Sequence, residues 1–332
     1  MFSWLKREKK QYLDCPYLKH SIHFFYDNIR ACCSNVEGPM FYKEPHTNNI
    51  NLDYIYSCRE KIVDSINNKD KEWYPAECKD CCELNNHISK NKIKNFNNKV
   101  EKIYFQNFMT CNAKCTYCAF GKVEKGYKYK VVPIIKNMIE KNILSKNAYV
   151  YMSGGEITIY PEFEELFSIL SNYLDSCIEI FSSGIKYSDA IKEAFKQNKC
   201  RIVISLDSGC RETYLKIKQV DCFDSVVNNI KSYISYSENA KDRIVLKYII
   251  VDNANDNKEE IEKFINLVVS LGVKRVRLDI DYEKYKYAMH KRVPNHYFEL
   301  YDYFHKLAND NNLKIEICEQ SEDIIKYSRN QI

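Results

Sequence analysis

Hydrophobic and polar residues alternate in a regular way from about residue 100 onward. Short runs rich in Ile, Val, Tyr and Phe are bounded by polar or glycine-containing segments, a pattern typical of strands. The predicted strands lie at 102–108, 148–153, 178–183, 202–207, 244–251 and 274–280, with a closing strand at 313–319. Apolar residues recur at helical spacing between them, which predicts helices at 132–144, 161–174, 188–198, 222–236, 257–272 and 296–310.

This alternation of strands and helices predicts an α/β fold with a parallel sheet. Six strand-helix units are too few to close an eight-stranded barrel, so we expect an open partial (β/α)6 TIM-like barrel. In parallel α/β folds the chemistry gathers at the carboxyl ends of the strands. We therefore look for functional residues directly after each predicted strand.

Composition narrows the class of protein. A chain of 332 residues that is 45% apolar can bury one barrel-sized core beside a smaller module. The formal charge of +5 comes from 50 basic and 45 acidic residues without a long block of one sign, which argues against a nucleic-acid partner. No apolar run approaches the roughly 20 residues needed to span a bilayer, and the first ten residues lack the apolar core of a signal peptide. We expect a cytoplasmic protein without a membrane partner.

The fifteen cysteines are better interpreted as thiols than as disulfides, because cytosolic thiols are kept reduced. Three of them stand within eight residues, at Cys111, Cys115 and Cys118. Three thiolates are one fewer than a structural zinc ion or a closed 4Fe-4S cluster requires, so one metal position is left open. Taken alone, the loop also permits a zinc site that borrows its fourth ligand from elsewhere.

The spacing of these cysteines, with the aromatic Tyr117 before the last one, resembles the signature of the radical S-adenosylmethionine (radical SAM) enzymes. The resemblance implies a 4Fe-4S cluster whose open iron is chelated by S-adenosylmethionine. Reductive cleavage would then yield a 5′-deoxyadenosyl radical that abstracts a hydrogen atom from the substrate, with electrons from a donor such as flavodoxin or ferredoxin.

Motifs after the next three predicted strands resemble further elements of this family. The segment 153–158, SGGEIT, resembles its Gly-Gly-Glu element, although Ile157 replaces the usual proline. The segment 182–184, SSG, resembles a Thr-Asn-Gly element with Ser183 in place of Asn, and the segment from 205, SLDSG, resembles a Ser-Leu-Asp-Gly stretch. Besides Tyr117, the cofactor-binding residues that the resemblance implies are Gly154, Gly155, Glu156, Ser183, Ser205 and Asp207.

The first hundred residues carry a second group of cysteines. Cys15 precedes an expected hairpin turn at Asp27-Asn28, and Cys33 follows it. With Cys78 and Cys81, this arrangement resembles the auxiliary-cluster module called twitch, a relative of the SPASM domain. The ligand set permits a second 4Fe-4S cluster, a zinc site or no site, and Cys32 and Cys82 are adjacent thiols that could replace their neighbours. The predicted divisions of the chain are a cysteine-rich module at 1–90, a connector at 91–100, a radical SAM core at 101–320 and a tail at 321–332.

The sequence leaves the substrate open. We expect a carbohydrate-type small molecule, since the N-terminus has no recognisable helix-turn-helix element for binding a peptide, and oxidation through the auxiliary cluster would fit such a reaction. The alternatives are a peptide-modifying enzyme that crosslinks or epimerises, and a non-catalytic iron-sulfur or zinc protein. No Ser-His-Asp, Walker or His-Glu-x-x-His pattern is visible, so no catalytic acid or base is predicted.

Overall fold

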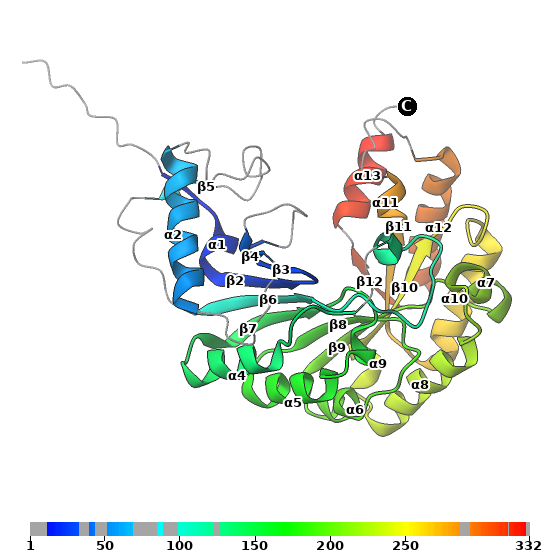
Figure 1. Ribbon diagram of the computed structural model, residues 1–332. Coiled ribbons are helices and arrows are strands. Elements are labelled where there is room, and N and C mark those ends of the chain that lie inside the picture. The colour runs from blue at the N-terminus through cyan, green and yellow to red at the C-terminus, as the bar shows by residue number, and fades with distance from the viewer. Residues whose placement is uncertain are drawn as a thin grey trace, which may run out of the picture. The chain divides into compact units, whose positions relative to one another are not determined.

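The computed structural model describes residues 12–32, 40–43, 52–68, 85–88, 99–122, 126–285, 293–317 and 319–329 (Figure 1). They belong to two compact units. The first comprises the described residues up to 107 together with 128–149, and the second comprises those of 108–127 and of 150 onward.

The first unit combines short strands with three helices. Its strands are β1 (Tyr12–Asp14), β2 (Ser21–Phe25), β3 (Asn28–Arg30), β4 (Met40–Lys43), β5 (Asn85–Ile88), β6 (Val100–Gln106) and the start of β7 (Leu144–Met152). Its helices are α1 (Pro16–His20), α2 (Leu52–Asn68) and α4 (Val132–Glu140). Strand β2 pairs in parallel with β6 and antiparallel with β3, which pairs antiparallel with β4, while β1 pairs antiparallel with β5.

The predicted hairpin is present in this unit as β2 and β3. Its turn lies one residue earlier than expected, because Asn28 already belongs to β3. Phe24 of β2 stacks on Phe105 of β6 with ring centroids 5.3 Å apart, and the buried Arg59 of α2 donates to the Ser21 carbonyl at 2.7 Å. These contacts join the hairpin to β6 and to α2.

The second unit contains a parallel sheet. Its strands are the end of β7, β8 (Ile178–Ser182), β9 (Cys200–Ser205), β10 (Ile244–Ile250), β11 (Arg275–Ile280) and β12 (Lys314–Ile317). They lie side by side in chain order, and each neighbouring pair is parallel. Within the described residues β12 has β11 as its one neighbour, so the sheet does not close. The predicted open, barrel-like α/β fold is confirmed.

Helices follow the strands of the second unit. They are the short η2 (Ala119–Lys122) and η3 (Ile157–Ile159), then α5 (Phe163–Tyr173), α6 (Asp189–Lys196), α7 (Arg211–Lys218), α8 (Phe223–Tyr236), α9 (Ala240–Arg243), α10 (Lys258–Leu271), α11 (Tyr282–Tyr285), α12 (Asn295–Asp310) and α13 (Glu319–Arg329). Figure 1 shows α5, α6 and α8 along the same side of β8 and β9. Helix α7 was not predicted, because its residues had been interpreted as a motif after β9.

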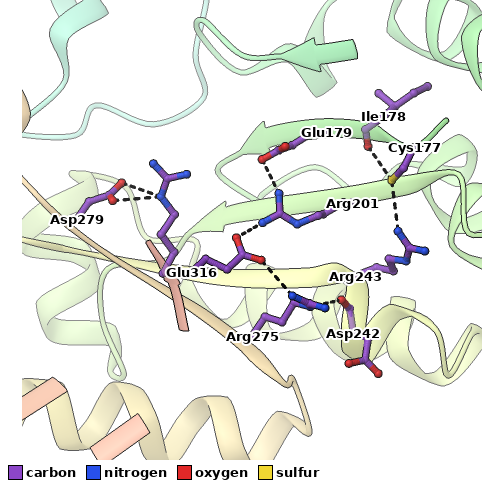
Figure 2. Close-up of polar contacts among 10 residues, drawn as sticks. Cys177, Ile178, Glu179, Arg201, Asp242, Arg243, Arg275, Asp279 and Glu316 are labelled. Carbon is purple, nitrogen blue, oxygen red and sulfur yellow. Dashed lines mark hydrogen bonds and ion pairs between the residues drawn. The ribbon is translucent and has the colours of Figure 1, made fainter. Parts of the chain in front are cut away.

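Alternate residues of these strands have different surroundings. In β8, Ile178, Ile180 and Ser182 are buried, whereas Glu179 and Phe181 are partly exposed. This alternation is expected where one face of a sheet packs on helices. Figure 2 shows that the other face carries ion pairs near the amino ends of the strands, and Arg201 of β9 pairs there with Glu179 at 2.5 Å.

The ion pairs extend across the sheet. Arg201 also pairs with Glu316 of β12, and Arg275 lies 3.6 Å from the same carboxylate while donating to the Asp242 carbonyl at 2.8 Å. Arg277 and Asp279 form a separate pair at 3.1 Å (Figure 2). Charged side chains from β8, β9, β11 and β12 therefore balance one another on this face.

Within the described ranges, no helix is both long enough and apolar enough to cross a bilayer.

Candidate functional site

The cysteine loop occupies residues 111–118 of the second unit. Cys111 and Cys115 are partly buried and Cys118 is exposed, and all three are free thiols. In the described part of the chain, no three Cys, His, Asp or Glu side chains converge closely enough to hold one metal ion. A 4Fe-4S cluster instead takes one thiolate per iron, so its ligands need not converge on one point. Three thiols in one loop leave one iron of a 4Fe-4S cluster without a protein ligand, so the donor set fits a cluster with one open position.

The Gly-Gly-Glu segment lies beside the residues that lead into this loop. The Gly155 N–H donates to the Phe108 carbonyl and the Glu156 N–H to the Thr110 carbonyl, both at 2.8 Å. A Cβ atom on Gly155 would stand 2.3 Å from the Thr110 oxygen. Gly154 has φ 109°, a conformation that favours glycine. Glycine is required at position 155 because the backbone of Thr110 approaches it closely.

Glu156 is buried, with 1% of its surface exposed. Its Oε1 accepts from the hydroxyls of Thr158 at 2.6 Å and Ser182 at 2.7 Å, and its Oε2 accepts from the Ser183 N–H at 2.5 Å. The Ser183 hydroxyl donates in turn to the side-chain oxygen of Asn112 at 3.1 Å. The carboxyl ends of β7 and β8 thus meet the cysteine loop through Glu156 and Ser183.

Three of these partners were not predicted. Thr158, Ser182 and Asn112 lie inside the motif segments but were given no role: Ser182 and Asn112 directly flank Ser183 and Cys111, and Thr158 stands two residues after Glu156. Their proximity in sequence to Glu156, Ser183 and the first cysteine was the available signal.

Tyr117 and Asp207 meet at the carboxyl end of β9. The Tyr117 hydroxyl donates to Asp207 Oδ2 at 2.5 Å, and Lys218 Nζ donates to that hydroxyl at 2.8 Å and to the same carboxylate. The other oxygen of Asp207 accepts from the Ile249 N–H at 2.9 Å. Asp207 is fully enclosed, and Lys218 was absent from the predicted site because lysines are usually solvated and nothing in the local sequence marks this one.

Burial acts on the thiols of the loop. It raises the pKa of Cys111 to about 11. It also raises the pKa of Cys115, although the neighbouring Lys218 ammonium opposes that rise. A cluster ligand has to be a thiolate, so a positive charge beside Cys115 favours the form that binds iron.

A cavity of about 250 Å³ lies next to the loop. Its walls come from Thr116 and Tyr117, from the residues after β10 and from Asp281 after β11; the lining residues are Thr116, Tyr117, Lys216, Val251, Asp252, Asn253, Ala254, Asp281 and Lys284. Ser205, the last residue of β9, is partly exposed. The carboxyl ends of the strands therefore provide both the cysteine loop and a cavity with charged residues in its lining, as expected for a parallel sheet.

The predicted N-terminal cluster site lies mostly outside the described residues. Cys15 is buried before α1, and Cys32 follows β3 with its carbonyl oxygen 3.3 Å from His23 Nδ1. Cys33, Cys78, Cys81 and Cys82 are outside the described ranges. The auxiliary module, its ligands and the predicted domain boundaries stay predictions.

A known family model matches a large part of the second unit. Residues 108–268 match the family model described as "Radical SAM superfamily". These residues form a radical SAM domain. Enzymes of this superfamily use a 4Fe-4S cluster and S-adenosylmethionine, in agreement with the cofactors that the cysteine loop implies.

Curated relatives include probable GTP 3′,8-cyclases. That of Saccharolobus islandicus (strain Y.N.15.51) is 29% identical over 189 residues, and that of Saccharolobus solfataricus is 27% identical over 190 residues. Each alignment covers 56% of this chain and 58% of the relative. The chain therefore spans little more than half the length of these relatives.

The fold is also similar to that of Streptococcus suis SuiB. The structure of SuiB bound to the precursor peptide SuiA aligns with a TM-score of 0.52 and 14% identity, covering 86% of this chain and 57% of SuiB. The structure of SuiB by itself gives a TM-score of 0.51 at 13% identity over 86% and 58% of the two chains. At this identity the likeness concerns the fold.

Proposed function

We propose that the protein is a radical SAM enzyme that cleaves S-adenosylmethionine reductively and abstracts a hydrogen atom from its substrate. The observation that carries the proposal is the pair of backbone hydrogen bonds from Gly155 and Glu156 to the residues just before Cys111. They hold a buried carboxylate beside a loop of three free thiols. Cys111, Cys115 and Cys118 would hold a 4Fe-4S cluster there, and its chemistry would be to deliver the electron for reductive cleavage of S-adenosylmethionine.

Each element of the site has a distinct task in this proposal. Cys111, Cys115 and Cys118 hold the cluster. Glu156 receives the methionyl ammonium, because a carboxylate oxygen can accept two hydrogen bonds and the Ser183 N–H occupies one position on Oε2. Gly154, Ser183 and Ser205 lie at the same strand ends and stay predicted cofactor contacts. None of the described side chains is assigned as a catalytic acid or base.

The proposal is tested with anaerobically reconstituted protein. We expect the reduced parent to form 5′-deoxyadenosine from S-adenosylmethionine, and we expect Cys115→Ala to form none, because the cluster loses a ligand. Cys222→Ala is the matched control: this thiol stands at the start of α8 and makes no capping hydrogen bond. Product formation by Cys115→Ala at the parent rate would refute the site. A parent that binds iron but never cleaves S-adenosylmethionine would support the non-catalytic alternative.

The substrate remains a choice between two classes. A carbohydrate-type molecule was expected from the sequence, but the relatives named above give it no support, since their names refer to GTP and to a precursor peptide. The charged lining of the cavity, with Asp252, Asp281 and Lys284, favours a polar substrate. Candidate sugars and peptides carrying deuterium at carbon can be offered in turn, and the substrate class is the one whose deuterium appears in 5′-deoxyadenosine.

The N-terminal thiols have a separate test. If they hold a second 4Fe-4S cluster, the parent should contain about eight irons, and a variant with both Cys78→Ala and Cys81→Ala about four. The variant should still cleave S-adenosylmethionine, because the loop at 111–118 is intact. Stoichiometric zinc with four irons in the parent would indicate that the N-terminal thiols hold a structural zinc ion, since zinc has no redox chemistry.

A further inference from the structure

Lys218 and Asp207 form an enclosed ion pair where the cysteine loop meets the end of α7. The two side chains are 1% and 0% exposed. Lysine and aspartate are almost never fully buried unless they are paired. A buried pair is nevertheless weak evidence for stability, because taking both charges out of water is costly. The contacts of this pair with the cysteine loop indicate a role besides stability.

The pair is joined to the cysteine loop on both sides of Cys115. Tyr117, two residues after this cysteine, donates its hydroxyl hydrogen to Asp207 at 2.5 Å and accepts from Lys218 at 2.8 Å. The main chain of the loop is also hydrogen-bonded to α7. The Lys114 N–H donates to the Lys218 carbonyl at 2.9 Å, and the Thr116 N–H donates to the Ile217 carbonyl at 3.0 Å.

Cys115 lies between Lys114 and Thr116, the two loop residues whose N–H groups are bound to α7. The Lys218 ammonium acts electrostatically on its thiol. The Lys218 ammonium is paired with the Asp207 carboxylate. Asp207 is held in turn by the Ile249 N–H and by the Asn255 amide, which donates to the Asp207 carbonyl at 2.8 Å. A series of hydrogen bonds therefore runs from β10 through Asp207 and Tyr117 to the cysteine loop.

We propose that Tyr117, Asp207 and Lys218 form a buried clamp that holds Cys115 in position for cluster binding, with the Lys218 ammonium as the counter-charge of its sulfur. They act through Cys115 and are positioning residues. For Tyr117 and Asp207 this differs from the direct cofactor contact expected from the sequence. The inference rests on the proposed function only in taking 111–118 as the cluster loop.

The clamp can be tested first without iron. Hydrogen exchange in the full-length, iron-free protein should be about tenfold faster at the N–H groups of Lys114 and Thr116 in Lys218→Met than in the parent, because the loop opens more often. Lys218→Arg should restore most of the protection. Exchange in α10 reports whether the variants are folded, and Lys231→Met on the exposed face of α8 is the matched control.

The second readout is the cluster itself. After reconstitution with iron and sulfide, a chelator should remove iron from Lys218→Met and from Tyr117→Phe about 10- to 100-fold faster than from the parent. The double variant Asp207→Asn, Lys218→Met should lose iron more slowly than Lys218→Met, because the charge balance beside the sulfur is restored. The electron paramagnetic resonance spectrum of the reduced cluster should change in the single variants and return towards the parent in Lys218→Arg.

Parent-like loop exchange and iron retention in Lys218→Met and in Tyr117→Phe would overturn the clamp. Faster exchange in α10 together with parent-like exchange at Lys114 and Thr116 would also overturn it, since the residues would then serve the fold as a whole and not the loop. Because the first readout needs neither iron nor S-adenosylmethionine, a parent that fails to cleave S-adenosylmethionine would refute the proposed function and leave the clamp result intact.

Discussion

The two ends of the sheet in the second unit hold their charges in different ways. At the carboxyl ends, Lys218 and Asp207 are enclosed, with 1% and 0% of their side chains exposed. At the amino ends, Arg201 and Glu179 retain 23% and 16% exposure (Figure 2). Water still solvates the second pair but not the first, so the same type of contact should matter far more at the carboxyl ends.

The largest expected difference concerns stability. Lys218→Met leaves Asp207 buried without its counter-charge, and loss of one partner of a buried pair costs about 3–5 kcal/mol. We expect a corresponding fall in the free energy of unfolding of the iron-free protein, measured by urea denaturation. The double variant Asp207→Asn, Lys218→Met should recover part of the lost free energy of unfolding. If it is as unstable as Lys218→Met alone, the unpaired charge of Asp207 is not the cause of the destabilisation.

The next largest effect concerns cofactor affinity. Glu156→Ala removes the proposed acceptor of the methionyl ammonium, and a charge-assisted hydrogen bond contributes about 1.5–3 kcal/mol, roughly a tenfold to hundredfold change in affinity. Equilibrium binding of S-adenosylmethionine to the iron-loaded variant measures it. Glu179→Ala, at the opposite end of the neighbouring strand, is the matched control and should bind as the parent does. An unchanged dissociation constant in Glu156→Ala would refute this role.

The smallest effect is expected at the amino ends. Arg201→Met breaks its contacts with Glu179 and Glu316, but partly solvated ion pairs contribute about 0–1 kcal/mol each. We expect a small loss in the free energy of unfolding, a smaller loss at high salt, and unchanged formation of 5′-deoxyadenosine. Loss of cleavage activity in this variant would contradict the view that the charges at the amino ends do not affect the site at the carboxyl ends.

The strands were predictable because their buried runs are short and well bounded. The prediction of 178–183 corresponds to β8 (Ile178–Ser182), and that of 244–251 to β10 (Ile244–Ile250). The start of β7 was missed by four residues, since 144–147, LSKN, has few strand-forming residues and acquires its conformation from pairing. Helix α7 was missed because polar residues dominate 211–218 and its helical pattern is weak.

The sequence by itself determined the parallel α/β fold and the family, because strand periodicity and the spacing of Cys111, Cys115 and Cys118 are local properties of the chain. It also placed Glu156 and Asp207 at or near the carboxyl ends of strands. Only the tertiary structure decided which side chains meet at those ends. Lys218 lies 100 residues or more after the three cysteines of the loop, Cys111, Cys115 and Cys118, and nothing local distinguishes it from a solvated lysine. Packing of α7 against the loop encloses it beside Cys115, and enclosure gives its charge a role there.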